Sequence, residues 1–149
     1  MSYRTRRSLQ IDQVFLQVAT DISSLSHAVR AKVGAIIVGK DNNIQAYGYN
    51  GTPTGFDNQA EIEVEEKLVT KPETLHAESN AIAKIAKSPV SCEGSTLYVT
   101  MSPCFECSKL IIQSGIKRVV YEIPYRETSG IDLLKKCNVK VEHIERNGK

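Results

Sequence analysis

The chain has 149 residues, of which 41% are hydrophobic and 24% are charged, and its formal net charge is +2. This length and composition are typical of one globular domain with a real core. The small net charge gives no indication of a nucleic-acid surface, and no apolar run approaches the roughly 18 residues of a membrane span. We expect one soluble domain over residues 1–149, with flexible ends at residues 1–8 and 145–149.

The N-terminus and the cysteines bear on where the protein acts. Three arginines within residues 1–10 are not followed by an apolar segment, which argues against a signal peptide or a membrane anchor. Four cysteines suit a reducing compartment better than a disulfide framework. We therefore expect a cytoplasmic protein, located in the host cytoplasm if the chain is encoded by a virus.

The first third of the chain predicts a helix followed by a β-hairpin. Apolar residues recur at helical spacing over residues 11–25, which indicates an amphipathic helix against a core. The apolar run at residues 33–38, a turn, and the segment 44–49 are typical of two antiparallel strands. Residues 50–58 are rich in turn formers, and their glycines allow the backbone to approach a ligand closely. We interpret this stretch as a functional loop.

The remainder predicts alternating helices and strands after one irregular stretch. Residues 59–75 fit either a short solvated helix or an irregular insertion, and we interpret their acidic run as a solvated face rather than a metal site. Residues 76–87 predict a helix with Thr74 as N-cap. Further elements are predicted at 96–101 (strand), 102–115 (helix), 118–121 (strand), 131–137 (helix) and 139–144 (strand). This order indicates a three-layer α/β/α fold with a mixed sheet of about five strands.

Two short motifs carry the chemistry, namely His76-Ala77-Glu78 and Pro103-Cys104-Phe105-Glu106-Cys107. One histidine and two cysteines supply three zinc ligands, and the open fourth position for water is the arrangement of a catalytic site. Cys104 and Cys107 share a helix face near its N-terminus, where the helix dipole favours thiolates. Glu78 is close enough to exchange protons with the water without being a ligand. The order H-x-E followed by P-C-x-x-C is the signature of zinc deaminases, so we expect one catalytic zinc ion per chain.

Other interpretations of these residues are possible. A single C-x-x-C also occurs in thioredoxin-like redox pairs and in zinc ribbons, but a ribbon needs a second such pair and the chain has none. If Glu78 only favours the helix dipole, the protein binds zinc without turnover. The remaining candidates His27, Cys92, Cys137 and His143 form no close-spaced ligand set, so we expect no structural zinc and interpret the two lone cysteines as small buried residues.

Beyond the zinc motifs, the chain resembles the deoxycytidylate (dCMP) deaminases of the cytidine and deoxycytidylate deaminase superfamily over about residues 11–144. The additional matching segments are residues 33–35, 48–53, 55–58, 97–100 and 111–117. Gly-Tyr-Asn-Gly-Thr-Pro with Gly-Phe-Asp-Asn is the part that points to the deoxycytidylate branch. The resemblance implies zinc-dependent hydrolysis of dCMP to dUMP and ammonia, which supplies dTTP synthesis. Glu78 would carry a proton from water to N3 of the base and then to the departing ammonia.

The resemblance also implies the residues that contact the substrate. Asn50 matches an asparagine that anchors sugar and base in this superfamily, although Asn-Gly is also a common turn pair. A monophosphate needs cationic or hydroxyl partners, and Arg126 could equally be a surface charge. The predicted substrate contacts are Asn50, Ala77, Ser26, Arg30, Tyr125 and Arg126.

Regulation is implied by the resemblance alone. Deoxycytidylate deaminases are commonly hexamers that dCTP with Mg²⁺ activates and dTTP inhibits, and Asn50 would couple effector to substrate. The predicted effector residues are Gly51, Thr52, Gly55, Phe56, Asp57 and Asn58. The expected partners are dCMP, the two triphosphates and other copies of the chain, with neither membrane nor nucleic acid. The alternatives are a tRNA adenosine deaminase or other nucleic-acid base deaminase, and a non-catalytic zinc-binding protein.

Overall fold

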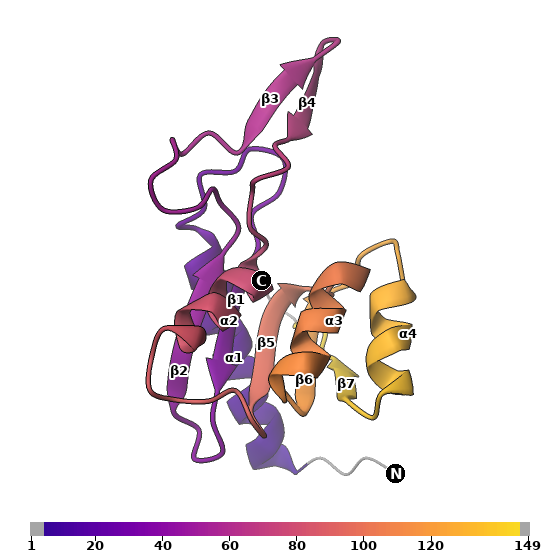
Figure 1. Ribbon diagram of the computed structural model, residues 1–149. Coiled ribbons are helices and arrows are strands. Elements are labelled where there is room, and N and C mark those ends of the chain that lie inside the picture. Colours follow the sequence, from indigo (N-terminus) through magenta and orange to yellow (C-terminus); the bar gives the residue numbers. More distant parts are fainter. Residues whose placement is uncertain (1–4, 147–149) are drawn as a thin grey trace.

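A five-stranded mixed sheet forms the centre of the computed structural model, which describes residues 5–146 (Figure 1). In the order of the sheet, its strands are β2 (Ile44–Tyr49), β1 (Gly34–Val38), β5 (Thr96–Met101), β6 (Arg118–Ile123) and β7 (Lys140–His143). Strand β1 pairs antiparallel with β2 and β5, whereas β5, β6 and β7 are parallel. The helices are α1 (Arg6–Ser23), α2 (Ala77–Ala86), α3 (Phe105–Ser114) and α4 (Ser129–Lys136).

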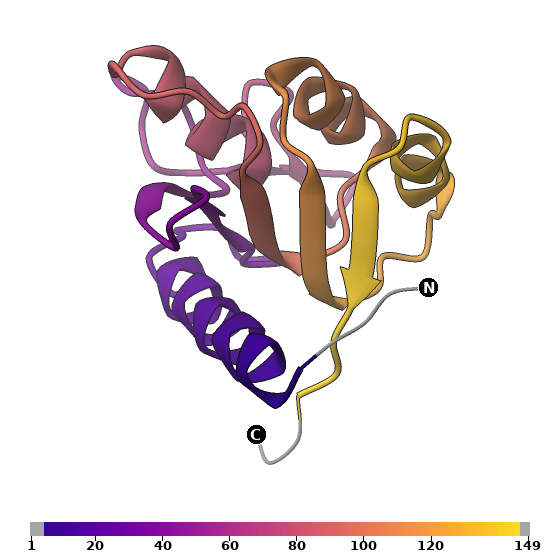
Figure 2. The ribbon, with the colours of Figure 1, turned by 90° about the horizontal axis from the view of Figure 1, so that it is seen from below.

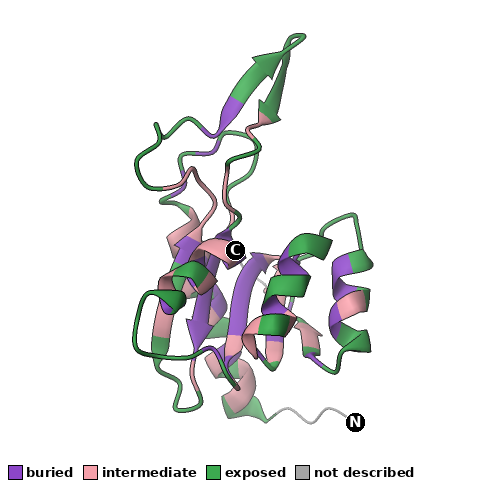
Figure 3. Cartoon of the chain, viewed as in Figure 1, coloured by how far each residue is buried: buried purple, intermediate pink, exposed green. Residues whose placement is uncertain are grey.

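Helices cover both faces of the sheet, which confirms the predicted three-layer α/β/α fold. Helix α1 packs on one face, and α2, α3 and α4 lie on the other (Figure 2). Side chains alternate along β1, so that Ile36 contributes to the core with α1 and Ile37 to the core with α2–α4. All residues of β1 are buried, as the centre of the sheet in Figure 3 shows. Because both faces of the strand are covered, its sequence is a continuous apolar run.

A buried ionic network fastens α1 to three strands. Asp12, which is 2% exposed, accepts a hydrogen bond from the Tyr98 hydroxyl at 2.7 Å and pairs with Arg118. The Arg118 guanidinium also pairs with Glu142 on β7. Each buried charge therefore has an ionic partner, which a charge removed from water requires.

Close backbone approach positions the start of helix α2. A Cβ atom at Gly48 on β2 would clash with the Ala77 carbonyl oxygen and lie 2.6 Å from the Ala81 nitrogen. Only glycine allows this helix to lie so near the strand. The first turn of α2, which carries the His-Ala-Glu motif, is held against the sheet edge in this way.

Residues 59–75 form a β-hairpin rather than the predicted helix or irregular insertion. Strands β3 (Glu61–Val64) and β4 (Lys67–Thr70) make a separate two-stranded sheet that projects from the body (Figure 1). The turn between them consists of Glu65 and Glu66, both at positive φ. Apolar and polar residues alternate along β3 with the period of a strand, and this signal was obscured by the acidic composition.

Several predicted element boundaries were also wrong. Helix α1 begins at Arg6 with Thr5 as N-cap and ends at Ser23, so residues 6–8 are helical rather than a flexible end. Arg146, expected in a loose tail, donates hydrogen bonds to Gln17 and Thr20. Residues 1–4 and 147–149 of the predicted flexible ends lie outside the described residues. Among residues 5–146, no helix has both the length and the apolar character needed to cross a bilayer.

Candidate active site

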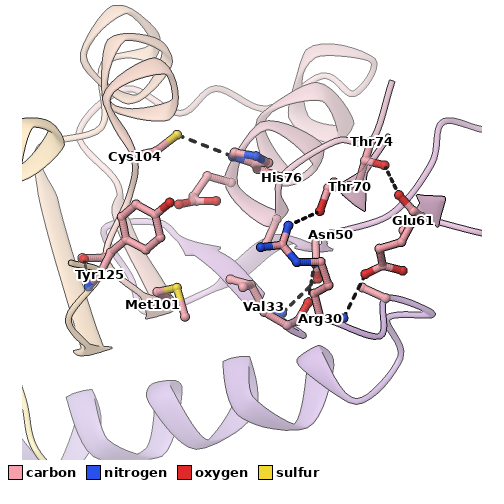
Figure 4. Close-up of a pocket in the computed structure, with 16 residues that line it drawn as sticks. Arg30, Val33, Asn50, Glu61, Thr70, Thr74, His76, Met101, Cys104 and Tyr125 are labelled. Carbon is pink, nitrogen blue, oxygen red and sulfur yellow. Dashed lines mark hydrogen bonds between the residues drawn. The ribbon is translucent and has the colours of Figure 1, made fainter. Parts of the chain in front are cut away.

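The structure brings the three predicted zinc ligands together at the N-terminal ends of α2 and α3. Figure 4 shows two of them, His76 and Cys104, facing one another. His76 is the N-cap of α2, which corrects the predicted Thr74. Cys104 is the N-cap of α3, which begins at Phe105 rather than at the predicted residue 102. The Nδ1 atom of His76 lies 3.5 Å from Cys104 Sγ and 3.3 Å from Cys107 Sγ.

These distances fit a tetrahedral zinc site. Zinc–nitrogen and zinc–sulfur bonds of about 2.05 and 2.3 Å at a tetrahedral angle separate nitrogen from sulfur by about 3.6 Å. All three ligand atoms lie within 4.8 Å of one another. One imidazole and two sulfurs, all at helix N-termini that favour anions, are therefore arranged to hold one zinc ion.

Protons occupy this cluster when no metal is bound. Hydrogen bonds from Cys107 and His76 lower the pKa of Cys104 to about 3, despite partial burial. The same hydrogen bond to Cys104, together with burial, raises the pKa of Cys107, and the hydrogen bond to Cys104 raises that of His76. The lowered pKa of Cys104 favours the thiolate form that a zinc ion binds, and metal binding at such a cluster releases the protons of the other ligands.

Glu78 is buried in the first turn of α2 and lines the same cavity as His76 and Cys104. The residue is 4% exposed. Burial raises the pKa of its carboxyl to about 7, because the charged form loses its hydration. A carboxyl group with this pKa exchanges protons readily near neutral pH, as a general acid and base must.

The cavity next to the triad has a volume of about 270 Å³, just below the roughly 300–1,000 Å³ typical of small-ligand sites. Four of the predicted substrate contacts line it, namely Arg30, Asn50, Ala77 and Tyr125. Ala77 is the first residue of α2, so its N–H has no acceptor within the helix and can donate to a ligand.

Asn50 supports the loop before β1 as well as lining the cavity. Its side-chain oxygen accepts a hydrogen bond from the Val33 N–H at 2.9 Å, and its amide group donates to the Ala31 carbonyl at 2.8 Å. These contacts use one of the two amide hydrogens, so the other can donate to a ligand. Ser26, which is buried and does not line the cavity, donates its hydroxyl to the Asn50 carbonyl at 2.7 Å.

The structure places the other sequence-predicted residues outside this cavity. Arg126 is exposed and is not one of the lining residues. Cys92 is buried as predicted, but Cys137 is exposed at the end of α4, where the sequence pattern predicted a buried residue.

A cavity-lining residue that the sequence did not indicate is Glu61, at the start of the hairpin. Its side chain is buried, and both Glu61 and Thr70 line the cavity (Figure 4). Nothing in the local sequence separates Glu61 from the exposed glutamates that follow it. Its burial depends on a segment about thirty residues away.

Most of the predicted effector residues surround a second cavity of about 260 Å³. Gly51, Thr52, Gly55, Phe56 and Asn58 line it, as does Lys84 from α2. Asp57 does not line this cavity and instead pairs with Lys71 at 3.1 Å.

The two cavities share a wall. Gly51 and Leu75, which both line the second cavity, exchange two backbone hydrogen bonds. Their chain neighbours Asn50 and His76 line the first cavity. A displacement of the Gly51–Leu75 pair would therefore act on both cavities.

Comparisons with known proteins agree with this geometry. Residues 9–123 match the cytidine and deoxycytidylate deaminase zinc-binding region. Human deoxycytidylate deaminase is 40% identical over 117 residues, which cover 76% of this chain and 65% of the human protein. The deoxycytidylate deaminase of Mycobacterium phage D29 is 37% identical over 121 residues, with 74% of this chain and 92% of the phage protein covered. The chain thus spans about two thirds of the human relative.

A solved structure extends the match to nearly the whole fold. The dCMP deaminase from the cyanophage S-TIM5, crystallised in complex with dCMP and dUMP, is 44% identical with a TM-score of 0.86. The match covers 95% of this chain and 100% of the cyanophage chain. On this evidence, the chain belongs to the cytidine and deoxycytidylate deaminase family.

Proposed function

We propose that the protein catalyses the hydrolytic deamination of dCMP to dUMP and ammonia. The observation that carries this proposal is the position of the buried Glu78 carboxyl beside a His-Cys-Cys triad, in a cavity that Arg30 also lines. The 44% identical cyanophage enzyme, whose structure contains dCMP and dUMP, supports the choice of substrate. By this proposal the product supplies dTTP synthesis in the cytoplasm.

Each group at the site has a distinct role in this proposal. Zinc held by His76, Cys104 and Cys107 would supply a water molecule that ionises near neutral pH. Glu78 would take one proton of this water and deliver it to N3 of the cytosine ring as the oxygen adds to C4. It would then move the second proton from the added oxygen to the amino group, so that the C4–N bond breaks, ammonia leaves and a C4 carbonyl forms. Its burial keeps the carboxyl away from bulk solvent, so that the proton is passed to the substrate.

The remaining lining residues orient the nucleotide. The spare Asn50 amide hydrogen and the Ala77 N–H donate to the sugar and the base. The Arg30 guanidinium and the Tyr125 hydroxyl bind the 5′-phosphate, because charge-assisted bonds from arginine suit phosphate oxygens. Ser26 acts through Asn50 rather than on the phosphate, as its buried hydroxyl is occupied by the Asn50 carbonyl.

We further propose that dCTP with Mg²⁺ activates the enzyme and dTTP inhibits it, both from the second cavity, in a homohexamer. The shared Gly51–Leu75 wall supports a coupling between the cavities. Phe56→Ala is expected to remove the response to both triphosphates, and an unchanged response would contradict this assignment. Light scattering of the purified protein tests the hexamer.

The proposed activity is tested by the loss of cytosine ultraviolet absorbance, with dCMP and deoxycytidine compared in parallel on zinc-loaded protein with dCTP and Mg²⁺ present. We expect turnover of dCMP and a much lower kcat/KM for deoxycytidine, because the nucleoside lacks the phosphate that Arg30 binds. Glu78→Gln serves as the inactive control. No turnover of dCMP by protein that contains one zinc ion per chain would refute the proposal.

A further inference from the structure

The hairpin missed by sequence reasoning reaches the candidate phosphate side of the cavity. Residues 24–33, which connect α1 to β1, lie outside any helix or strand. This connection carries Arg30, whose side chain is exposed at the cavity. A segment without regular structure needs other groups to set its position, because its backbone polar atoms have no helix or strand partners.

Glu61 supplies the contacts that hold the backbone at Arg30. One oxygen of its carboxylate, Oε2, accepts hydrogen bonds from the N–H groups of Val29 and Arg30, each at 2.9 Å. Glu61 is only 3% exposed, so these bonds are shielded from competing water. A buried carboxylate that accepts two consecutive amides fixes the direction in which the Arg30 side chain leaves the backbone.

Thr70 then holds the other end of the same side chain. Arg30 Nη1 donates a hydrogen bond to the Thr70 hydroxyl at 3.0 Å (Figure 4). Glu61 and Thr70 are paired residues of β3 and β4, so one pair at the base of the hairpin contacts both ends of Arg30. The bond to Thr70 uses one of the five guanidinium hydrogens and leaves the others for an anion.

We propose that Glu61 and Thr70 are positioning residues that aim Arg30 at the 5′-phosphate, which makes the base of the β3–β4 hairpin a determinant of specificity for nucleoside monophosphates over nucleosides. This inference rests on the proposed deamination of dCMP. Neither residue touches the reacting atoms, and both act through Arg30. The segment 59–75, to which the sequence pattern assigned no chemistry, therefore takes part in substrate selection.

The test compares Thr70→Val, which removes the hydroxyl at nearly constant volume, with Thr70→Ser, which retains it. We expect Thr70→Val to raise KM for dCMP about tenfold with little change in kcat, because a bond to a charged group is lost from binding rather than from chemistry. The ratio of kcat/KM for dCMP to that for deoxycytidine should fall by the same factor. Thr70→Ser should keep this ratio near the wild-type value. Glu61→Ala should lower the ratio at least as far as Thr70→Val does.

Two controls separate positioning from a purely structural role. Glu63→Gln changes an exposed glutamate on the same strand and should leave the ratio at the wild-type value. In an Arg30→Ala background, Thr70→Val should have no further effect on KM, because residues that act through one group are not additive. If the Glu61→Ala variant does not fold, the comparison of Thr70→Val with Thr70→Ser and the double-mutant cycle with Arg30→Ala still test the proposal.

The outcomes distinguish this inference from the proposed function. If the wild-type enzyme does not deaminate dCMP, the proposed function fails and this inference fails with it. If the wild-type enzyme prefers dCMP but Thr70→Val keeps the full preference, only the inference is overturned. An equal loss from Thr70→Val with and without Arg30 also overturns it, since Thr70 would then not act through Arg30.

Discussion

Replacing Glu78 with glutamine is expected to stabilise the metal-free protein at pH 8 while it removes the proposed proton carrier. Burial raises the pKa of this carboxyl from 4.5 to about 7, so the folded state binds the proton more tightly than the unfolded chain. Below pH 4.5 both states are protonated and the shift has no effect on stability. As the pH rises towards 7 the unfolded chain ionises first, and folding becomes less favourable. Each tenfold change in the ionisation constant is worth about 1.4 kcal/mol, so the full loss is about 3 kcal/mol above pH 7.

The assay is urea unfolding with a chelator and a reductant, followed by circular dichroism at pH 5 and pH 8. The difference in unfolding free energy between Glu78→Gln and wild type should grow by about 2.5 kcal/mol between these two pH values. Glu106→Gln is the matched control, because it removes an exposed carboxylate from the neighbouring helix α3. A difference that does not change with pH would show that burial does not set the ionisation of Glu78.

Three further predictions concern the metal, the packing and the buried charges. Cys104→Ala should abolish zinc binding, measured by metal analysis, whereas Cys137→Ala should retain one equivalent because that cysteine is exposed and does not belong to the cluster of ligand residues. Gly48→Ala should destabilise the protein by about 1–3 kcal/mol in urea unfolding and lower kcat, since the added methyl displaces α2; wild-type values would contradict the close packing. Asp12→Ala should cost about 3–5 kcal/mol of unfolding free energy because it leaves the partly buried Arg118 charge with less compensation, and a loss below about 1 kcal/mol would refute that view.

Local chemistry is what the sequence by itself determined. The ligand types at His76, Cys104 and Cys107 indicated zinc, and the order of the motifs indicated a deaminase, because residue type and short spacing are properties of the chain itself. The alternation of strands and helices likewise predicted the layers of the fold, which the structure confirms. A continuous apolar run such as β1 has one low-energy place, the middle of a covered sheet.

Only the tertiary structure decided which polar residues are buried and which distant residues they contact. Asp12 lies in an otherwise ordinary amphipathic helix, and its burial depends on Arg118, 106 positions away in the chain. Glu61 is one of several glutamates in an acidic run, yet it alone among them is buried, beneath the backbone of Arg30. Local sequence specifies which groups a residue offers, whereas burial and partner depend on which distant segment covers it. The candidate zinc ligands could therefore be predicted from the sequence, but the contacts between the hairpin and Arg30 beside the cavity could not.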